Sequence, residues 1–224
     1  MKILDIAVKG ILNVLDGCIK NNIKELYLAS SSEVYQTPEK IPTDEEEPLK
    51  IPDIYNPRYS YGGGKILTEL MGVHYGKIFF NKLVIFRPHN VYGPNMGYDH
   101  VIPEFINRFK KMKKKDNKFE IKGSGNETRS FIFIDDFVSA FDLILKKGKH
   151  LNIYNIGTDE EIKIRQLALK ISKFFNKKII LRRIKIAKGS TKHRCPNILK
   201  ITKLGFKQKC NLNFGLHKTI DWYS

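Results

Sequence analysis

The chain has 224 residues, of which 42% are hydrophobic, 11% aromatic and 28% charged. This length fits one large domain or a domain with a smaller lobe, and the composition excludes a disordered chain, a collagen and a disulfide-stapled mini-protein. The three scattered cysteines, Cys18, Cys195 and Cys210, form neither a disulfide framework nor a zinc motif. With no apolar run near the ~18 residues of a membrane span and no signal peptide, we expect a cytoplasmic protein without membrane partner or metal.

The charge balance is strongly basic, because 40 Lys and Arg residues against 23 Asp and Glu residues give a net charge of +17. Such an excess can attract nucleic acid or an acidic membrane surface. The lysines, however, are spread along the chain, and the densest run, residues 110–115, ends a helical pattern where cations suit the helix dipole. We therefore expect a solvated lysine-rich surface. Nucleic-acid binding is the less favoured alternative, and it would require an affinity that falls steeply with salt.

The first part of the chain predicts helices alternating with strands. Apolar spacing predicts a helix over residues 3–19, and more than one apolar stripe indicates burial on two sides. Residues 25–29 predict a short strand, followed by a serine-rich turn and an acidic loop over 36–56. Residues 82–87 are apolar enough for a central strand of a parallel sheet. Between them, a helix begins near Tyr61, and one of its faces carries Ile66, Leu67, Leu70, Met71 and His74.

The second part continues the alternation, so we predict an α/β fold with a parallel sheet. Asp135 and Asp136 are expected to cap the helix that runs to residue 145. Further helices are predicted over 101–113 and 164–175, with two short helices at the end. The expected strands cover residues 119–122, 130–134, 151–157 and 178–185.

One expected feature of a dinucleotide-binding fold is missing from the sequence. Such folds open with a strand, a glycine-rich turn and a helix whose N-terminus holds the pyrophosphate. This chain opens on a helical pattern and contains neither G-x-G-x-x-G nor G-x-x-G-x-x-G. The glycines at 62–64 and at 123 and 125 do not bridge a strand and a helix with that spacing. We expect a partial sheet with an uncovered edge and no pyrophosphate site.

Tyr61 and Lys65 stand four residues apart at the start of a predicted helix, and therefore on one face. A lysine ammonium beside a phenol favours the phenolate and lowers its pKa, so the pair could act as a general acid and base near neutrality. The spacing alone is weak evidence in a chain with 10 Tyr and 40 basic residues, where a surface pair would be favoured without further context.

Four further motifs give the pair a context. They are Ser30-Ser-Ser-Glu-Val-Tyr35, Arg87-Pro-His-Asn-Val-Tyr-Gly-Pro94, the stretch from Gly123 to Asp135, and Tyr154-Asn-Ile-Gly157. In order and spacing the five motifs resemble the extended short-chain dehydrogenase/reductase family of sugar-nucleotide epimerases, dehydratases and decarboxylases, from about residue 1 to 224. The resemblance implies a partial Rossmann-like, doubly wound parallel sheet with a smaller C-terminal substrate-binding lobe. Residues 1–97 would form the C-terminal part of the Rossmann-like domain and 98–224 mainly the lobe, with about 130–157 returning to the sheet.

The resemblance also implies a catalytic set and a cofactor. Tyr61 falls on the catalytic tyrosine, Lys65 on the lysine that holds the nicotinamide ribose, and Ser31 on the Ser/Thr that relays the proton. For Ser31 the alternative is a hydroxyl that only caps the next turn. Ser30 and Pro88 join Tyr61 and Lys65 as cofactor-binding residues. The cofactor would be NAD, and NADP stays open because the discriminating residue would lie in the missing glycine-rich part.

The same resemblance implies a site for a nucleotide-diphosphate sugar. Asn90, Arg129 and Arg194 fall on positions that grip the diphosphate, and Arg58 and Val101 belong to the same site. Arginine suits this role because its planar fork binds phosphate oxygens in a bidentate way. A plain surface role is the alternative for Arg129 and Arg194.

Glu33 leaves the reaction type open. Family dehydratases and decarboxylases have Thr-(Ser/Asp)-Glu here, with a catalytic glutamate, whereas simple 4-epimerases do not usually have an acid and GDP-mannose 3,5-epimerases have a cysteine. The stretch Ser31-Ser32-Glu33 is intermediate, and a structural role for Glu33 is as compatible with it as a catalytic one. The main expectation is an NAD-dependent epimerase that works by transient oxidation. The alternatives are a 4,6-dehydratase or decarboxylase that uses Glu33, and a non-catalytic binding or dimerisation module.

The resemblance further implies a homodimer built through a four-helix bundle from the helix over 3–19 and the helix that carries Tyr61. Because the opening segment is missing, the isolated chain is expected to be inactive and not to bind NAD at micromolar affinity. A truncated chain, a gene split so that a separate chain supplies the missing strands, and a degenerate homologue are all compatible with this pattern.

Overall fold

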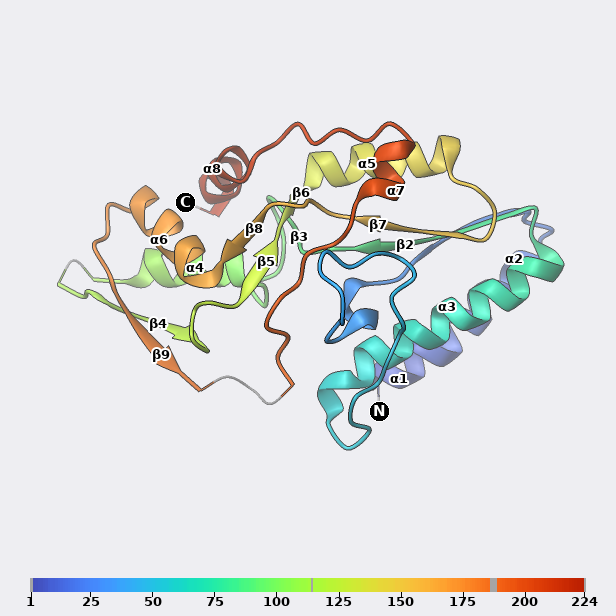
Figure 1. Cartoon of the computed structure of the whole chain (residues 1–224), viewed down its shortest axis with the longest axis horizontal. Coiled ribbons are helices and arrows are strands. Elements are labelled where there is room, and N and C mark those ends of the chain that lie inside the picture. Colours follow the sequence, from blue (N-terminus) through green and yellow to red (C-terminus); the bar gives the residue numbers. More distant parts are fainter. Residues whose placement is uncertain (1, 114, 186–188, 224) are drawn as a thin grey trace.

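Three parallel strands form the central sheet of the computed structural model, which describes residues 2–113, 115–185 and 189–223 (Figure 1). The strands are β1 (Glu25–Ala29), β2 (Lys82–Pro88) and β7 (Asn152–Ile156), in the order β1-β2-β7. Leu28 pairs with Ile85, and Phe86 pairs with Tyr154. Strand β2 is buried along five consecutive residues because helices cover both of its faces. The predicted α/β class and the central place of β2 are confirmed.

The two faces of the sheet are covered by different helices (Figure 1). On one face, α2 (Ile11–Lys20) and α3 (Ser60–Phe79) lie against Leu83 and Ile85. On the other, α5 (Ile134–Lys147) and α7 (Leu199–Lys203) bury Val84 and Phe86. The alternation of β2 side chains between the two layers is what a doubly wound sheet requires.

The first helical segment differs from its prediction in two ways. It consists of α1 (Lys2–Asp5), a π-helical stretch Ile6–Gly10, and α2. Only one side is buried within the chain, through Ile11 and Leu15, whereas Ile6 is 64% exposed. The expectation of burial on two sides is therefore wrong for the single chain, and the second apolar stripe faces outward.

Helix α3 buries a stripe of small residues. The buried stripe consists of Gly64, Thr68, Gly72 and Gly76, and a Cβ atom on Gly72 would lie 2.5 Å from Cδ1 of Leu28. Small side chains therefore let the helix sit close to the strands, and the bulkier apolar residues stand on its other sides. The apolar face expected on this helix is only partly covered within the chain, since Met71 packs against the core whereas Leu70 is 54% exposed and His74 is exposed.

The C-terminal lobe is built from short strand pairs and three helices (Figure 1). Its core stacks Phe109 on Phe119, with ring centroids 4.1 Å apart and planes inclined by 6°. The parallel pairs are β4 (Lys118–Lys122) with β9 (Ile180–Ile184) and β3 (Val91–Tyr92) with β6 (Ile132–Phe133), and the antiparallel pair is β5 (Thr128–Ser130) with β8 (Glu161–Lys163). The helices are α4 (Val101–Lys111), α6 (Ile164–Phe174) and α8 (Leu212–Tyr223).

Three details of the lobe depart from the sequence predictions. The strand predicted over 130–134 is split between β5 and β6, and β8 was not predicted. Asp135 and Asp136 do not cap α5, because the helix already begins at Ile134. The Asp136 carboxylate instead accepts hydrogen bonds from the backbone N–H groups of Lys209 and Cys210, at 3.0 and 2.8 Å, and so fastens the C-terminal segment to α5. Of the predicted lysine run, Lys114 lies outside the described residues.

Within the described ranges, none of the helices combines the length and the apolarity that a bilayer crossing demands. The same residues contain no cluster of three or more His, Cys, Asp or Glu side chains that could hold a metal ion. Cys18, Cys195 and Cys210 are all free thiols.

Candidate functional site

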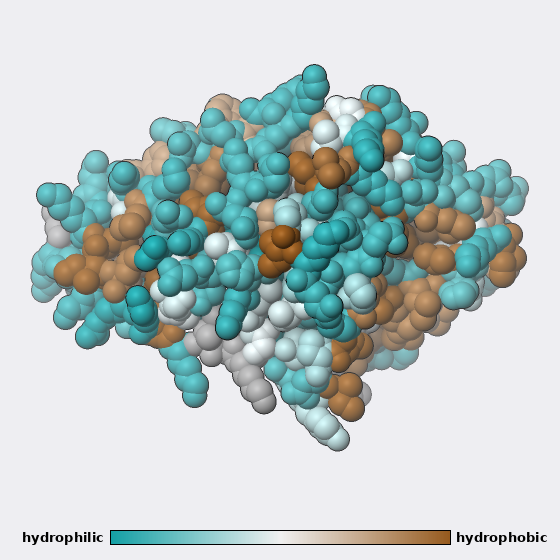
Figure 2. Space-filling view, viewed as in Figure 1, coloured by the Kyte–Doolittle hydropathy of each residue, from teal (hydrophilic) through white to brown (hydrophobic). Residues whose placement is uncertain are grey.

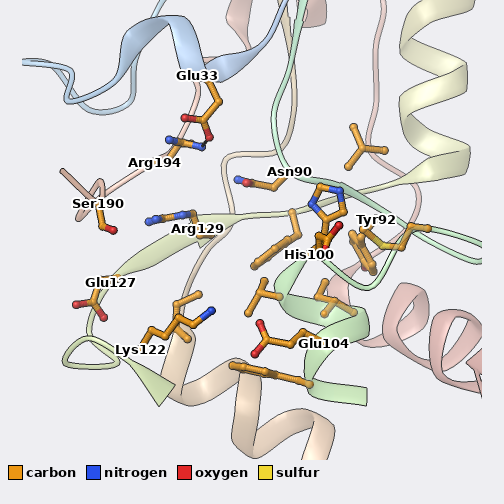
Figure 3. A pocket seen from close by; sticks show the side chains of 18 of the residues that line it. Glu33, Asn90, Tyr92, His100, Glu104, Lys122, Glu127, Arg129, Ser190 and Arg194 are labelled. Atoms are coloured by element: carbon orange, nitrogen blue, oxygen red, sulfur yellow. Dashed lines mark hydrogen bonds and ion pairs between the residues drawn. The ribbon is translucent and has the colours of Figure 1, made fainter. Parts of the chain in front are cut away.

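A pocket of about 350 Å³ lies between the C-terminal ends of the sheet strands and the lobe (Figure 3). Its lining brings together residues that are far apart in the sequence, from the turn after β1, the loop after β2, α4, β5 and the segment before α7. Six of the side chains singled out in the sequence line this one pocket: Glu33, Arg58, Asn90, Val101, Arg129 and Arg194.

The arginines of the pocket are held by hydrogen bonds to the chain itself. Arg194 donates from Nη1 to Oε1 of Glu33 at 2.5 Å and from Nη2 to Oγ1 of Thr191 at 3.2 Å. Arg129 donates to the carbonyl oxygens of Thr128 and Thr191, at 2.7 and 2.9 Å. Burial and the nearby Arg194 cation lower the pKa of Arg129 to about 10. Neighbouring guanidinium groups that repel each other in a partly buried site favour the arrival of an anion.

Glu33 faces these cations and points toward Arg194 in Figure 3. Burial raises the pKa of its carboxyl group, but Arg194, together with Arg58 and Arg129, outweighs that effect, so the pKa lies below its usual value. Glu33 is therefore an anion in the absence of ligand, and its basicity is weakened by its own ion pair.

Asn90 and Val101 are placed by the backbone around them. Asn90, two residues after the end of β2, has a positive φ of 40°, and its Nδ2 donates to the carbonyl oxygen of Ser130 at 2.8 Å. This hydrogen bond joins the loop after β2 to the end of β5 and fixes the amide at the pocket wall. Val101 opens α4 and adds an apolar side chain to the lining.

Tyr61 and Lys65 lie outside the pocket lining, on the first turns of α3. Lys65 Nζ is 6.0 Å from the centroid of the Tyr61 ring and donates to the carbonyl oxygen of Ala29 at 2.8 Å. Burial lowers the pKa of Lys65, against an opposing effect of Glu69. The predicted pair is thus brought together at the end of β1, with the Tyr61 side chain 46% exposed.

Ser31 lies at the start of the 3-10 turn Ser32–Tyr35, where its Oγ accepts the backbone N–H of Glu33 at 3.2 Å. The capping role weighed for this hydroxyl is therefore present. The first turn of α3 packs directly on this turn, because a Cβ atom on Gly62 would lie 2.7 Å from the carbonyl oxygen of Glu33. The close approach explains the glycine at that position and brings the start of α3, with Tyr61, against the Ser31–Glu33 segment.

The two remaining predicted cofactor residues occupy the ends of the neighbouring strands. Ser30 follows β1, is 4% exposed, and donates its hydroxyl hydrogen to Oε1 of Glu69. Pro88 ends β2 beside Ile156 of β7. Both positions lie at the carboxyl edge of the parallel sheet, where ligands of open α/β folds bind.

Sequence reasoning missed a buried polar network behind these residues. Arg87 and Glu69 form an ion pair with side chains only 2% and 5% exposed. Arg87 also donates to the Tyr35 hydroxyl, which in turn donates to Oδ1 of Asn155, and that oxygen lies 3.1 Å from Nε2 of His89. The signal was an arginine within the apolar strand pattern of β2, because a buried charge requires a partner.

Comparisons with known proteins identify the family of the chain. The sequence profile described as "NAD dependent epimerase/dehydratase family" matches residues 1–157. A dTDP-D-glucose 4,6-dehydratase of Dictyostelium discoideum is 35% identical over 176 residues, which cover 76% of this chain and 40% of the relative. A GDP-mannose 3,5-epimerase of Arabidopsis thaliana is 32% identical over 216 residues, which cover 94% of this chain and 56% of the relative.

Solved structures match over nearly the whole chain. A dTDP-glucose 4,6-dehydratase of Bacillus anthracis in complex with NAD has a TM-score of 0.85 at 23% identity, over 98% of this chain and 68% of that one. A UDP-glucose 4-epimerase of Thermotoga maritima with UDP-glucose has a TM-score of 0.87 at 24% identity, over 98% and 70%. The chain spans 40% of the Dictyostelium relative and 31% of a trifunctional Arabidopsis one. Because the family profile covers well over half of its length, the chain belongs to the NAD-dependent epimerase/dehydratase family, in which the extended short-chain dehydrogenase/reductase enzymes are found.

Proposed function

We propose that this chain forms the catalytic and substrate-binding part of an NAD-dependent sugar-nucleotide epimerase that works by transient oxidation of the sugar. The observation that carries the proposal is that one pocket is lined by Arg58, Asn90, Arg129 and Arg194. It also contains Glu33, on whose backbone the start of α3 packs through Gly62. The relatives' names are those of sugar-nucleotide epimerases and dehydratases, which supports the same substrate class.

The charge and the size of the pocket suit a nucleoside diphosphate linked to a sugar. Three guanidinium groups face the Glu33 carboxylate, and the whole lining sets five Lys and Arg side chains against four carboxylates, so the pocket is weakly cationic before any ligand binds. Diphosphate oxygens would complete the hydrogen bonds of Arg129 and Arg194 and relieve the repulsion between them. The volume of about 350 Å³ lies within the range of small-molecule sites, and Val101 and Phe105 offer apolar contact for the nucleoside.

The residues present fit the nicotinamide end of the cofactor. The Lys65 ammonium has three protons, and one of them is directed to the carbonyl oxygen of Ala29, so further donors remain for ribose hydroxyls. When bound, NAD supplies the hydride acceptor for sugar oxidation. The described residues contain no succession of strand, glycine-rich turn and helix that could bind the pyrophosphate. The acidic or basic residue that distinguishes NAD from NADP belongs to that same unit, so the described residues do not contain it either.

In the reaction, Tyr61 accepts the proton of the sugar hydroxyl. Lys65 lies beside it, with Nζ 6.0 Å from the centroid of the phenol ring, and Ser31 would bridge the sugar hydroxyl and the phenol. Arg129 and Arg194 hold the diphosphate throughout the reaction. The oxidised sugar ring is therefore free to turn and to present its opposite face to the nicotinamide site. Tyr61 then returns the proton when the hydroxyl of inverted configuration forms.

The state of Glu33 supports epimerisation over the alternative reactions. A 4,6-dehydratase or decarboxylase would use Glu33 as a base, yet its ion pair with Arg194 lowers its pKa and so weakens it as a base. We expect a Glu33→Gln variant to keep epimerase activity. Loss of all turnover in that variant would favour the dehydratase or decarboxylase.

The same proposal includes a homodimer through α2 and α3. Figure 2 shows hydrophobic colour gathered along the side of the molecule where α3 lies, on an otherwise mostly hydrophilic face. On these helices Leu70 and Ile78 are 54% and 74% exposed, and Val14 is 47% exposed. A second copy would cover them. We also propose a cytoplasmic location and a separate chain that completes the sheet beside β1.

The experiment is to incubate the protein as its native cell makes it, together with any chain that completes its sheet, with NAD and a panel of UDP-, dTDP- and GDP-sugars, and to follow sugar inversion by proton NMR. We expect inversion of one sugar class, abolished in Tyr61→Phe. Full turnover in Tyr61→Phe would contradict the proposal. Equilibrium binding of the same nucleotide sugars, measured in parallel, tests the pocket separately from the cofactor.

A further inference from the structure

Glu69 is a buried carboxylate one helical turn after Lys65 on α3. Its two oxygens accept hydrogen bonds from the ends of two strands. The Ser30 hydroxyl donates to Oε1. Arg87 donates from Nε to Oε1 at 2.9 Å and from Nη2 to Oε2 at 2.6 Å, which is the bidentate geometry that arginine and carboxylate favour. The carboxylate therefore joins α3 to the ends of β1 and β2.

Lys65 and Glu69 together form a two-point anchor between α3 and β1. Lys65 binds the carbonyl oxygen of Ala29 at 2.8 Å, and Glu69 binds the hydroxyl of Ser30. Side chains four residues apart on the helix thus hold consecutive residues of the strand end. One contact alone would let the helix rotate about that point relative to the strand. Two contacts fix both the position of the helix along the strand end and its rotation about its own axis. The next residue along the chain is Ser31.

Arg87 holds the other end of the same turn. Its Nη1 donates to the Tyr35 hydroxyl at 2.7 Å and to the carbonyl oxygen of Glu45 at 3.1 Å. Tyr35 is the last residue of the 3-10 turn that Ser31 caps. Ser31 therefore lies between two residues that both depend on the ion pair, Ser30 through Glu69 and Tyr35 through Arg87.

We infer that Glu69 is a positioning residue of this site: through Ser30 and Arg87 it sets the place of Ser31 relative to Tyr61 and Lys65. The inference rests on the proposed function, in which those three side chains carry the proton. Glu69 itself does not line the pocket. Its action is therefore on geometry and charge, without contact with the substrate.

The charge of Glu69 gives this role a measurable signature. The polar groups that face Lys65 are the Tyr61 ring and Glu69 from α3 and the Ala29 carbonyl from β1. Burial lowers the pKa of Lys65, and Glu69 raises it. Removing the Glu69 charge should therefore lower the pKa of Lys65, an effect that a merely structural contact would not produce.

The test compares Glu69→Gln with Ser30→Ala in the whole ligand-free chain. Glutamine keeps the size and an acceptor oxygen but removes the charge, whereas Ser30→Ala keeps the charge and removes one anchor. The pKa of Lys65 is followed by carbon NMR of labelled lysine, with Lys65→Arg to assign its signal. We expect a lower Lys65 pKa in Glu69→Gln, a nearly unchanged one in Ser30→Ala, and a shifted Ser31 amide signal in both. An unchanged Ser31 signal in Ser30→Ala, or an unchanged Lys65 pKa in folded Glu69→Gln, would overturn the inference.

A second variant guards against misfolding, because Glu69→Gln leaves Arg87 buried without its counter-charge. The double variant Glu69→Gln, Arg87→Gln removes both charges and should show the same lowered Lys65 pKa. Under the proposed reaction, Glu69→Gln should reduce kcat by roughly a hundredfold, the cost of a misplaced catalytic group, with KM nearly unchanged. A raised KM with unchanged kcat would contradict the positioning role. Wild-type turnover tests the proposed function itself, so the two failures are distinguishable.

Discussion

Two arginine–glutamate pairs in this molecule have similar contacts and very different surroundings. Arg87 and Glu69 lie behind the sheet ends with side chains 2% and 5% exposed. Arg194 and Glu33 lie at the pocket, and the Glu33 side chain is 33% exposed. In the first pair every neighbour is protein, and further hydrogen bonds satisfy both partners. In the second pair, solvent or a ligand can reach the carboxylate.

The comparison indicates that burial, more than the ion-pair contact, decides what each pair does. A buried pair cannot exchange partners without leaving an uncompensated charge in a poorly polarisable interior. A pair at a pocket stays open on its exposed side, so an incoming anion can bind the guanidinium beside the carboxylate. We therefore assign the first pair to positioning and the second to ligand binding, and the variants below separate the two roles.

The largest effect is expected from Arg87→Met. It leaves the Glu69 carboxylate buried without its partner and should lower the free energy of unfolding by about 3–5 kcal/mol, measured by urea denaturation. Replacing both partners, as Arg87→Met with Glu69→Leu, should recover most of that loss because no lone charge remains. A loss below about 1 kcal/mol in the single variant would show that the pair is not buried as described.

The next effect concerns pH and the histidine attached to the buried network. Burial lowers the pKa of His89 to about 3, although its hydrogen bond with Asn155 opposes this. The unfolded chain binds a proton near pH 6.5, whereas the folded one does not until near pH 3, so stability should fall as the pH drops through this window. The slope contributed is about 1.4 kcal/mol per pH unit. Denaturation at pH 7 and pH 5 should show this slope in the wild type and its loss in His89→Gln, and an equal slope in both would contradict the assignment.

A smaller effect is expected from Arg194→Met, the matched substitution at the pocket. It removes charge-assisted hydrogen bonds to a diphosphate worth roughly 1.5–3 kcal/mol, so the affinity for inorganic pyrophosphate should fall by about tenfold to a hundredfold. Isothermal titration measures this. Arg87→Met, where it remains folded, should keep the wild-type affinity, and equal losses in both variants would remove the distinction between the pairs.

The smallest effect is the stability change of the same Arg194→Met variant. Because the Glu33 it leaves behind is one-third exposed, water can replace the lost partner, and we expect a loss of about 1 kcal/mol. Urea denaturation beside Arg87→Met makes the comparison direct. A loss as large as that of Arg87→Met would mean that the pocket pair is a structural pair as well.

The strands of the central sheet were predicted well, because each contains an apolar run long enough to be recognised as a strand without knowledge of its partner strand. Residues 25–29 and 82–87 became β1 and β2 almost residue for residue. Strand β8 escaped because it has three residues and exists through its pairing with β5. The buried stripe of α3 could not be predicted, because apolar periodicity marks Leu70 whereas close packing on the strands selects Gly72 and Gly76, which give no periodic apolar signal.

The pocket residues could be named from motif positions, since Arg129 and Arg194 belong to segments recognisable one by one. Their partners could not be named in the same way. The Arg194–Glu33 contact joins residues 161 positions apart, and only the fold brings them together. The Arg87–Glu69 pair was detectable in principle as two charges in buried elements, but nothing in the local sequence states that they bind each other.

The most direct test of the account is the binding of UDP, dTDP and GDP to the whole chain by isothermal titration, in the wild type and in Arg129→Met. The account predicts that at least one of these nucleotides binds with a stoichiometry of one per chain. It also predicts that Arg129→Met weakens that binding at least tenfold, because the variant removes a charge from the pocket wall. Absence of binding by all three, or binding that Arg129→Met leaves unchanged, would contradict the assignment of this pocket to a nucleotide diphosphate.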